Sequence, residues 1–248
     1  MKNYNFLISR KAFSSILMTL LFISSPAFAN DTSPPLFEAS YSLYRDGTEV
    51  GELNRKLSKG SDGAYVYQST NQTTGLVSLF YKLETTEESR WRVIENQLQT
   101  IEYNYHRLKN KKIRDIKTVF NWKTMQATNI ENHTESIINL ESGMFDKLNY
   151  QIEIMRALKK GKYPITYTII DSNKIKTYNF EFLGNETIET PLGTFETLKF
   201  LIQKPGDKRK SIIWCSQKHH YLPIVVDTIE KDGVTTSAII NTFKERDF

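Results

Sequence analysis

The sequence predicts a mainly β protein, built on a curved antiparallel sheet or half-barrel of roughly a dozen strands with one principal amphipathic helix. Turn signals recur about every ten residues, as in antiparallel sandwiches and barrels. The chain contains 13 Tyr and 14 Phe, residues that are enriched in strands. After the N-terminus, only one stretch has a clear helical period. Because a lone helix needs another element to cover its apolar stripe, we expect the sheet to wrap around it.

Residues 1–29 have the features of a signal peptide. Lys2, Arg10 and Lys11 form a basic start, residues 16–23 are apolar, and Ala27-Phe28-Ala29 is an A-x-A cleavage motif. The apolar run is too short to span about 30 Å of hydrocarbon. We therefore expect a cleaved leader and an exported chain rather than a membrane anchor.

Residues 30–248 are expected to form a single β-rich domain, because no repeat, low-complexity run or linker divides them. The cleavage point has no Cys, so the sequence does not predict a bacterial lipoprotein, and no second apolar run predicts a transmembrane segment in the mature chain. We expect a periplasmic location. The formal charge is +5, but removing the leader's three basic residues from 33 Lys and Arg against 28 acids leaves +2. This small excess gives no reason to expect a nucleic-acid or anionic-membrane partner.

The strands are expected where apolar and polar residues alternate between turn residues such as Asp46-Gly47, Pro191-Leu192-Gly193 and Lys231-Asp232-Gly233. Residues 75–81 are ambiguous between a short helix and a strand, because the run is too short for its period to decide. The other expected strands are 37–44, 48–57, 64–70, 91–94, 98–105, 112–122, 125–130, 136–140, 163–170, 175–182, 185–190, 194–202, 211–215, 221–228 and 234–243.

Residues 142–160 are the predicted helix. Ser142 suits the N-cap, and Gly161 suits the position just past the end. Apolar residues recur along one face at the helical period: Met144, Leu148, Ile152, Met155 and Leu158.

The first four residues of this stripe are the candidate ligand-binding residues: Met144, Leu148, Ile152 and Met155. A helix lying against a curved sheet can enclose an apolar cavity that holds a lipid, and it can equally pack into a filled core. A cavity larger than about 300 Å³ beside the helix would favour the ligand-binding interpretation.

The sequence offers no catalytic residues, no metal site and no cofactor motif. It has no H-E-x-x-H, C-x-x-C, G-x-S-x-G, phosphate-binding loop or G-x-G-x-x-G. His219 and His220 are adjacent, so in a strand they would point to opposite faces. Cys215 is the only cysteine and is expected to be a core residue. The acidic run 84–90 is expected to be a solvated strand edge or turn.

The segment 106–114 is the densest basic patch, with Tyr103 and Tyr105 just before it. One interpretation is contact with phosphate or anionic lipid. The other, which the composition favours, is a charged hairpin tip whose lysines discourage edge pairing.

Three motifs occur in order in the second half of the chain: MRALKKGK at 155–162, ETPLGTFETLK at 189–199, and IWCS at 213–216 followed by YLPIVV at 221–226. This pattern resembles the bacterial domain-of-unknown-function family 3108 (DUF3108), over about residues 37–246. The resemblance implies an exported protein without an assigned activity, so no catalytic residue is carried over.

Two positions depart from the family pattern. Ile224 stands where the signature has Val, and Cys215 where a larger residue is expected. More loosely, the plan of many strands and one helix looks like the half-barrels of the LolA/LolB lipoprotein carriers and RseB, which hold acyl chains. A shared fold does not by itself give a shared function.

The sequence therefore favours an exported, periplasmic, non-enzymatic binding or envelope-maintenance protein with a lipid or other apolar ligand. The first alternative is a protein-protein interaction module with a packed core, which would bind an envelope protein through an exposed sheet edge or the basic hairpin near Lys109 to Arg114. The least favoured is a hydrolase whose catalytic residues are scattered along the chain.

Overall fold

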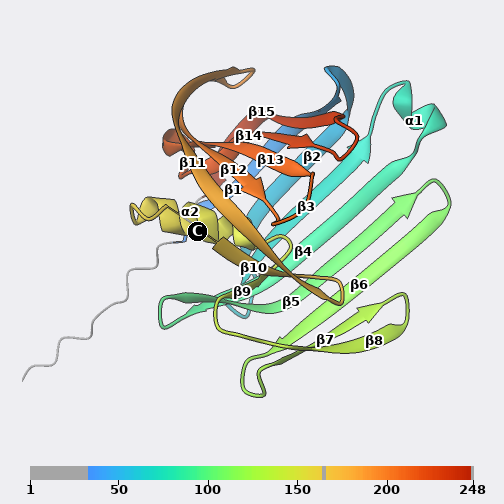
Figure 1. Ribbon diagram of the computed structural model, residues 1–248, viewed down its shortest axis with the longest axis vertical. Helices are drawn as coiled ribbons and strands as arrows, with labels where there is room; N and C mark the ends of the chain where they lie inside the picture. The colour runs from blue at the N-terminus through green and yellow to red at the C-terminus, as the bar shows by residue number, and fades with distance from the viewer. Residues whose placement is uncertain (1–32, 164–165, 247–248) are drawn as a thin grey trace, which may run out of the picture. The chain divides into compact units, whose positions relative to one another are not determined.

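The structure is a computed structural model that describes residues 33–163 and 166–246. The predicted signal peptide, residues 1–29, lies outside the described residues. Within them, 15 strands form one curved sheet that is not closed into a barrel (Figure 1). This confirms the predicted mainly β fold with one principal helix, although the strands outnumber the expected dozen.

The sheet has two halves that meet in the middle at β1 and β15. The first half contains β1 (Leu36–Arg45), β2 (Thr48–Lys59), β3 (Tyr65–Thr73), β4 (Leu83–Ile94), β5 (Gln97–Lys109), β6 (Lys112–Asn121), β7 (Gln126–Glu131) and β8 (Thr134–Asn139). The second half contains β9 (Met144–Asp146), β10 (Thr166–Asp171), β11 (Lys174–Thr190), β12 (Gly193–Gln203), β13 (Lys210–Ser216), β14 (Leu222–Ile229) and β15 (Thr235–Arg246). Two short helices, α1 (Val77–Phe80) and η1 (Gln217–His219), lie between strands.

The strand order is β8-β7-β6-β5-β4-β3-β2-β1-β15-β14-β13-β12-β11-β10-β9. Nearly every neighbour in space is a neighbour in sequence, so short hairpins build the sheet. The pairs are antiparallel except β9 with β10, which is parallel. The second half returns to the first: β9 lies near β5, and Arg114 of β6 donates to Ser172 Oγ, between β10 and β11, at 2.8 Å.

The helix α2 (Tyr150–Lys159) packs between these two halves. Its Ile152 and Met155 belong to an apolar cluster made mainly by the first half. Its Ile154 and Leu158 belong to a second cluster, made by β11, β12 and β13. The helix thus covers apolar side chains from both halves, which explains why one helix is sufficient for so large a sheet.

The helix is shorter at its start than the sequence predicts. Residues 144–146 form β9, and the N-cap of α2 is Asn149, not Ser142. The Asp146 carboxylate accepts the N–H groups of Leu148 (2.7 Å) and Asn149 (2.8 Å), and Asn149 Oδ1 accepts the Asp146 N–H. These reciprocal hydrogen bonds fix the turn between β9 and α2. The Ser142 hydroxyl instead donates to Gln97.

Three other segments differ from expectation or settle an open choice. Residues 175–182 and 185–190 belong to one strand, β11, because Gly184, at φ +115°, absorbs a register shift without ending it. Of the ambiguous segment 75–81, residues 77–80 are helical. The acidic run 84–90 is not an edge or a turn, because β4 pairs with strands on both sides. Cys215 is buried as predicted, and burial raises the pKa of its thiol.

Candidate functional site

A cavity of about 520 Å³ lies between the two halves of the sheet, beside the start of α2. Strands β2, β3 and β4 form one wall, and β10 to β14 form the other. The first turn of α2 and the residues just before it, including Leu148 and Gln151, close a third side. Residues more than 100 positions apart in the sequence therefore line one space.

The cavity wall is partly apolar. Its main apolar members are Leu53, Leu148, Ile154, Ile169, Ile202, Ile213 and Val226. Most of them are also members of the two apolar clusters that hold α2. An apolar part of a ligand would therefore contact the same surface that continues into the core.

The rest of the wall is charged, with basic residues in excess. The basic residues are Arg55, Lys147, Lys174, Lys176, Lys204, Arg209 and Lys210, and the acidic residues are Glu87, Asp171 and Asp207. The acids already have partners. Glu87 lies 3.9 Å from Lys147, Asp171 pairs with Lys176, and Asp207 lies 3.2 Å from Lys231.

Arg55 is the basic residue whose position is hardest to explain by folding alone. It lies on β2 between Leu53 and Leu57, on the face that points inward. Its Nε and Nη1 atoms are buried, and within the described residues nothing accepts a hydrogen bond from them. Its guanidinium lies 5.4 Å from the Tyr41 ring centroid. Arg55 as a whole is half-buried, but its two buried N–H donors lack an acceptor, and an anion in the cavity would supply one.

Strand register explains why Arg55 is unpaired. Arg55 is opposite Ser69 on β3, and Ser69 is opposite Glu87 on β4, so the cation and the carboxylate are two strands apart. Because neighbouring strands are about 4.8 Å apart, two such spacings separate Arg55 from Glu87. Glu87 is instead engaged by Tyr103, whose hydroxyl donates to it at 2.6 Å.

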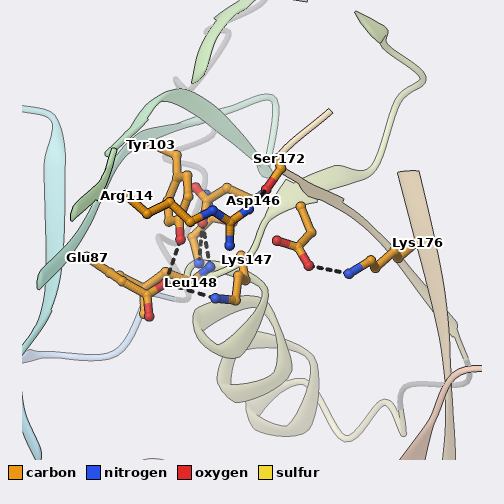
Figure 2. A network of polar contacts seen from close by, with 10 residues as sticks. Glu87, Tyr103, Arg114, Asp146, Lys147, Leu148, Ser172 and Lys176 are labelled. Carbon is orange, nitrogen blue, oxygen red and sulfur yellow. Dashed lines mark hydrogen bonds and ion pairs between the residues drawn. The ribbon is translucent and has the colours of Figure 1, made fainter. Parts of the chain in front are cut away.

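A buried polar network fixes the start of α2 beside this cavity (Figure 2). Asp146 is 1% exposed and accepts a hydrogen bond from Ser89 Oγ at 2.5 Å, in addition to the backbone N–H groups of Leu148 and Asn149. Asn149 donates to Thr100 Oγ1 at 2.7 Å. Burial raises the pKa of Asp146 to about 7, although its hydrogen bonds favour the carboxylate. The network ties the helix start to β4 and β5.

The structure places the four predicted ligand-binding residues in two different environments. Leu148 lines the cavity. Met144, Ile152 and Met155 are at most 3% exposed and lie in the apolar cluster, outside the cavity lining. Nothing here tests ligand binding by any of the four, and that assignment stays a prediction.

Sequence reasoning missed Arg55, although a signal for it was present. Leu53 and Leu57 share one face of a strand, and Arg55 must share it too because side chains alternate. An arginine between two inward leucines marks either a buried ion pair or a binding position. The sequence could not tell which, because the opposite wall comes from residues beyond 165.

The structure assembles no catalytic triad in the part of the chain that it describes. The cavity lining includes serines and carboxylates but no histidine. Ser216 Oγ and His219 Nδ1 are 3.0 Å apart, but His219 packs between the rings of Phe195 and Phe243. The described residues also contain no group of three metal-ligating side chains. Within residues 33–163 and 166–246, no helix has the length and apolar character needed to cross a membrane.

Comparison with known proteins gives a family and a fold. The profile described as "Protein of unknown function (DUF3108)" matches residues 37–239. No curated protein matches the chain. A crystal structure of a beta-barrel-like protein of domain of unknown function DUF1849 from Brucella abortus aligns with a TM-score of 0.63 at 8% identity, covering 87% of this chain and 99% of that one. That likeness shows the fold alone.

Two more distant structures share less of the geometry. A candidate lipoprotein from Parabacteroides distasonis aligns with a TM-score of 0.36 at 12% identity, covering 86% of this chain and 98% of that one. MucB in complex with MucA(peri) aligns with a TM-score of 0.18 at 8% identity, covering 89% and 97%. Similarity at this level says nothing about activity in this chain.

Proposed function

The chain belongs to the DUF3108 family, and we propose that it is a non-enzymatic binding protein of the bacterial cell envelope that holds an amphipathic, anionic ligand in the cavity beside α2. The observation that carries this proposal is Arg55, a cation with buried, unsatisfied donors facing a cavity of about 520 Å³. That volume lies within the usual range for small-molecule sites, about 300–1,000 Å³.

The apolar and the basic parts of the cavity lining together support an amphipathic ligand. The apolar residues around Leu53 and Ile169 suit an acyl chain or another apolar group. The excess of basic side chains suits a carboxylate or phosphate, and an arginine can bind either through two parallel hydrogen bonds. The predicted signal peptide supports export to the periplasm.

Native mass spectrometry on the mature protein, purified from the periplasm without detergent, tests this proposal. We expect a reproducible added mass that is released as a small amphipathic molecule on denaturation. The Arg55→Met variant should lose the added mass. The control is Lys56→Met, because Lys56 neighbours Arg55 but points to the opposite, exposed face of β2 and pairs with Glu38. Equal adducts in both variants would contradict the assignment of the site.

A fluorescent fatty acid with a free carboxylate provides a second test that does not depend on the natural ligand. Its methyl ester has the same apolar part without the charge. Since a hydrogen bond to a charged group contributes about 1.5–3 kcal/mol, the acid should bind roughly ten- to hundred-fold more tightly than the ester. Arg55→Met should remove this difference. Equal affinity of the wild type for acid and ester would count against an anionic ligand.

A further inference from the structure

The short helix α1 presents the most exposed large apolar side chains among the described residues. Leu76, Leu79 and Phe80 are 79%, 74% and 87% exposed. They are spaced i, i+3 and i+4 around one helical turn, so they lie on the same side of it. None of the helix residues is buried. We name Leu76, Leu79 and Phe80 the apolar tip.

Local hydrogen bonds hold the apolar tip in place. The Thr73 hydroxyl donates to the Tyr81 carbonyl at 2.9 Å and accepts from the Leu83 N–H at 3.0 Å, which closes the base of the segment. The Ser78 hydroxyl donates to the Gly75 carbonyl at 2.7 Å. The chain thus fixes the backbone while leaving its leucines and phenylalanine uncovered, an arrangement that folding of this domain does not require.

The turn between β5 and β6 carries lysines and lies beside the base of the apolar tip. The Asn110 N–H donates to the Lys82 carbonyl at 2.7 Å, and the Lys82 N–H donates to Asn110 Oδ1 at 3.0 Å. Lys109 Nζ lies 5.2 Å from the Tyr81 ring centroid. Lys111 and Lys112 follow in the same turn and are exposed. This is the predicted basic hairpin, for which contact with phosphate or anionic lipid is one of the two interpretations of the sequence.

The apolar tip lies at the end of the sheet toward which the cavity extends. In an up-and-down sheet, alternate hairpins share an end, so the β1–β2, β3–β4 and β5–β6 connections lie together. The β14–β15 turn joins them, since the Asp46 N–H donates to the Thr235 carbonyl at 2.9 Å. Along β3, the cavity-lining residues Ser69 and Asn71 lead toward α1, which Figure 1 shows beyond the ends of β3 and β4.

We propose that the apolar tip, together with the lysines of the neighbouring β5–β6 hairpin, docks on the surface of a bilayer that contains anionic phospholipids. Exposed leucine and phenylalanine enter the interfacial region, and lysines around them attract negative headgroups. Tyr81, half-apolar and half-polar, suits the same interface. The charge of the surrounding surface favours this occupant: the nearby acids already have partners, since Glu84 lies 3.1 Å from Lys82 and Glu52 accepts a hydrogen bond from Gln72 at 2.6 Å. Docking would place the tip's end of the cavity toward the lipid.

Vesicle co-sedimentation of the mature protein tests the proposal. Vesicles of phosphatidylglycerol with phosphatidylethanolamine should bind the protein at least ten-fold more tightly than vesicles of phosphatidylcholine. The double variant Leu79→Ser/Phe80→Ser should lose at least ten-fold in vesicle affinity. Ile137→Ser is its matched control, because Ile137 is 54% exposed on β8, away from the tip. Equal binding by the tip variant and the control would overturn the proposal.

The lysines have a separate test. Lys109→Gln and Lys111→Gln should each weaken binding to the anionic vesicles about five-fold, whereas Lys123→Gln, in the β6–β7 turn, should have no effect. Binding should also weaken as salt is raised above about 150 mM, since screening shortens the reach of these charges. Unchanged binding in both lysine variants would show that the contact is not electrostatic and would overturn the choice of an anionic surface.

Two further readouts separate this proposal from its rivals and from the proposed function. Trp emission of Phe80→Trp should shift to shorter wavelength with anionic vesicles, and no shift while the protein still sediments would place the contact elsewhere. If the wild type dimerises without lipid and Leu79→Ser/Phe80→Ser does not, the tip is a contact with a second copy. The tip variant should keep the ligand adduct, and Arg55→Met should keep vesicle binding, so either proposal can fail alone.

Discussion

Two adjacent rows of inward-facing side chains on β2, β3 and β4 have different environments, although they are only one side-chain repeat apart. In one row, Leu57, Tyr67 and Ser89 are opposite one another and at most 1% exposed. In the next, Arg55, Ser69 and Glu87 line the cavity. The same strands therefore build a packed core at one level and a polar binding space at the next.

The difference comes from what lies across from each row. Beside the first row, β9 and the start of α2 fill the space, and Ser89 is satisfied by Asp146. Beside the second, the opposite wall consists of strands that carry Lys174, Lys176 and Ile169. A closed core needs complementary apolar surfaces on both sides, and only the first row has them.

The largest effect on the free energy of unfolding should come from truncating a side chain in the packed core. Ile152→Ala should lower the free energy of unfolding by about 2–5 kcal/mol, because Ile152 is fully buried in the apolar cluster. Urea unfolding measures this change. Leu53→Ala, on the cavity wall, should cost less because part of its side chain already faces open space. Equal losses would mean that the cavity wall is packed like the core.

The pH dependence of stability should report Asp146. Since its native pKa of about 7 lies above the usual 3.8, the protonated form favours the native state. This stabilisation is complete below about pH 4 and is lost as the pH rises through 7. Between about pH 5 and 8, the wild type should lose about 2–3 kcal/mol of unfolding free energy relative to Asp146→Asn.

Denaturant titration at several pH values measures this difference. Asp232→Asn, at an exposed turn position, serves as the control and should follow the wild type. If wild type and Asp146→Asn show parallel pH curves, the carboxylate is ionised throughout and its hydrogen bonds outweigh its burial.

A gain of stability on mutation should distinguish the row that lines the cavity from the row in the packed core. Arg55→Met should raise the free energy of unfolding by about 1 kcal/mol, because it removes two buried donors that lack an acceptor and keeps an apolar side chain of similar length. Thermal unfolding of ligand-free protein measures the gain. A clear loss of stability would show that Arg55 serves the fold instead of a ligand.

The smallest effect should come from the residue that the sequence offered as the helix cap. Ser142→Ala should change the free energy of unfolding by less than about 0.5 kcal/mol, because Ser142 is exposed and does not cap α2. Urea unfolding checks this as well. A loss of 1 kcal/mol or more in the free energy of unfolding would show that Ser142 does cap α2.

The sequence by itself determined the local elements. Alternation predicted the long strands, residues such as Asp46-Gly47 predicted the hairpins, and the stripe through Ile152 and Met155 predicted one buried helix face. These are properties of short segments, set by side-chain period and turn chemistry. The prediction of the helix start failed at residues 142–149, because Met144 fits a helical stripe as well as it fits a buried strand.

Only the tertiary structure decided where the core ends and the cavity begins. Alternation places Arg55, Leu57 and Glu87 on the inner face, but it does not say what lies opposite them. For Arg55 and Glu87 that depends on β10 to β14, whose residues follow Arg55 by more than 100 positions. The physical reason is that burial and pairing are set by contacts between distant segments, whereas the period of a strand is set by its own backbone.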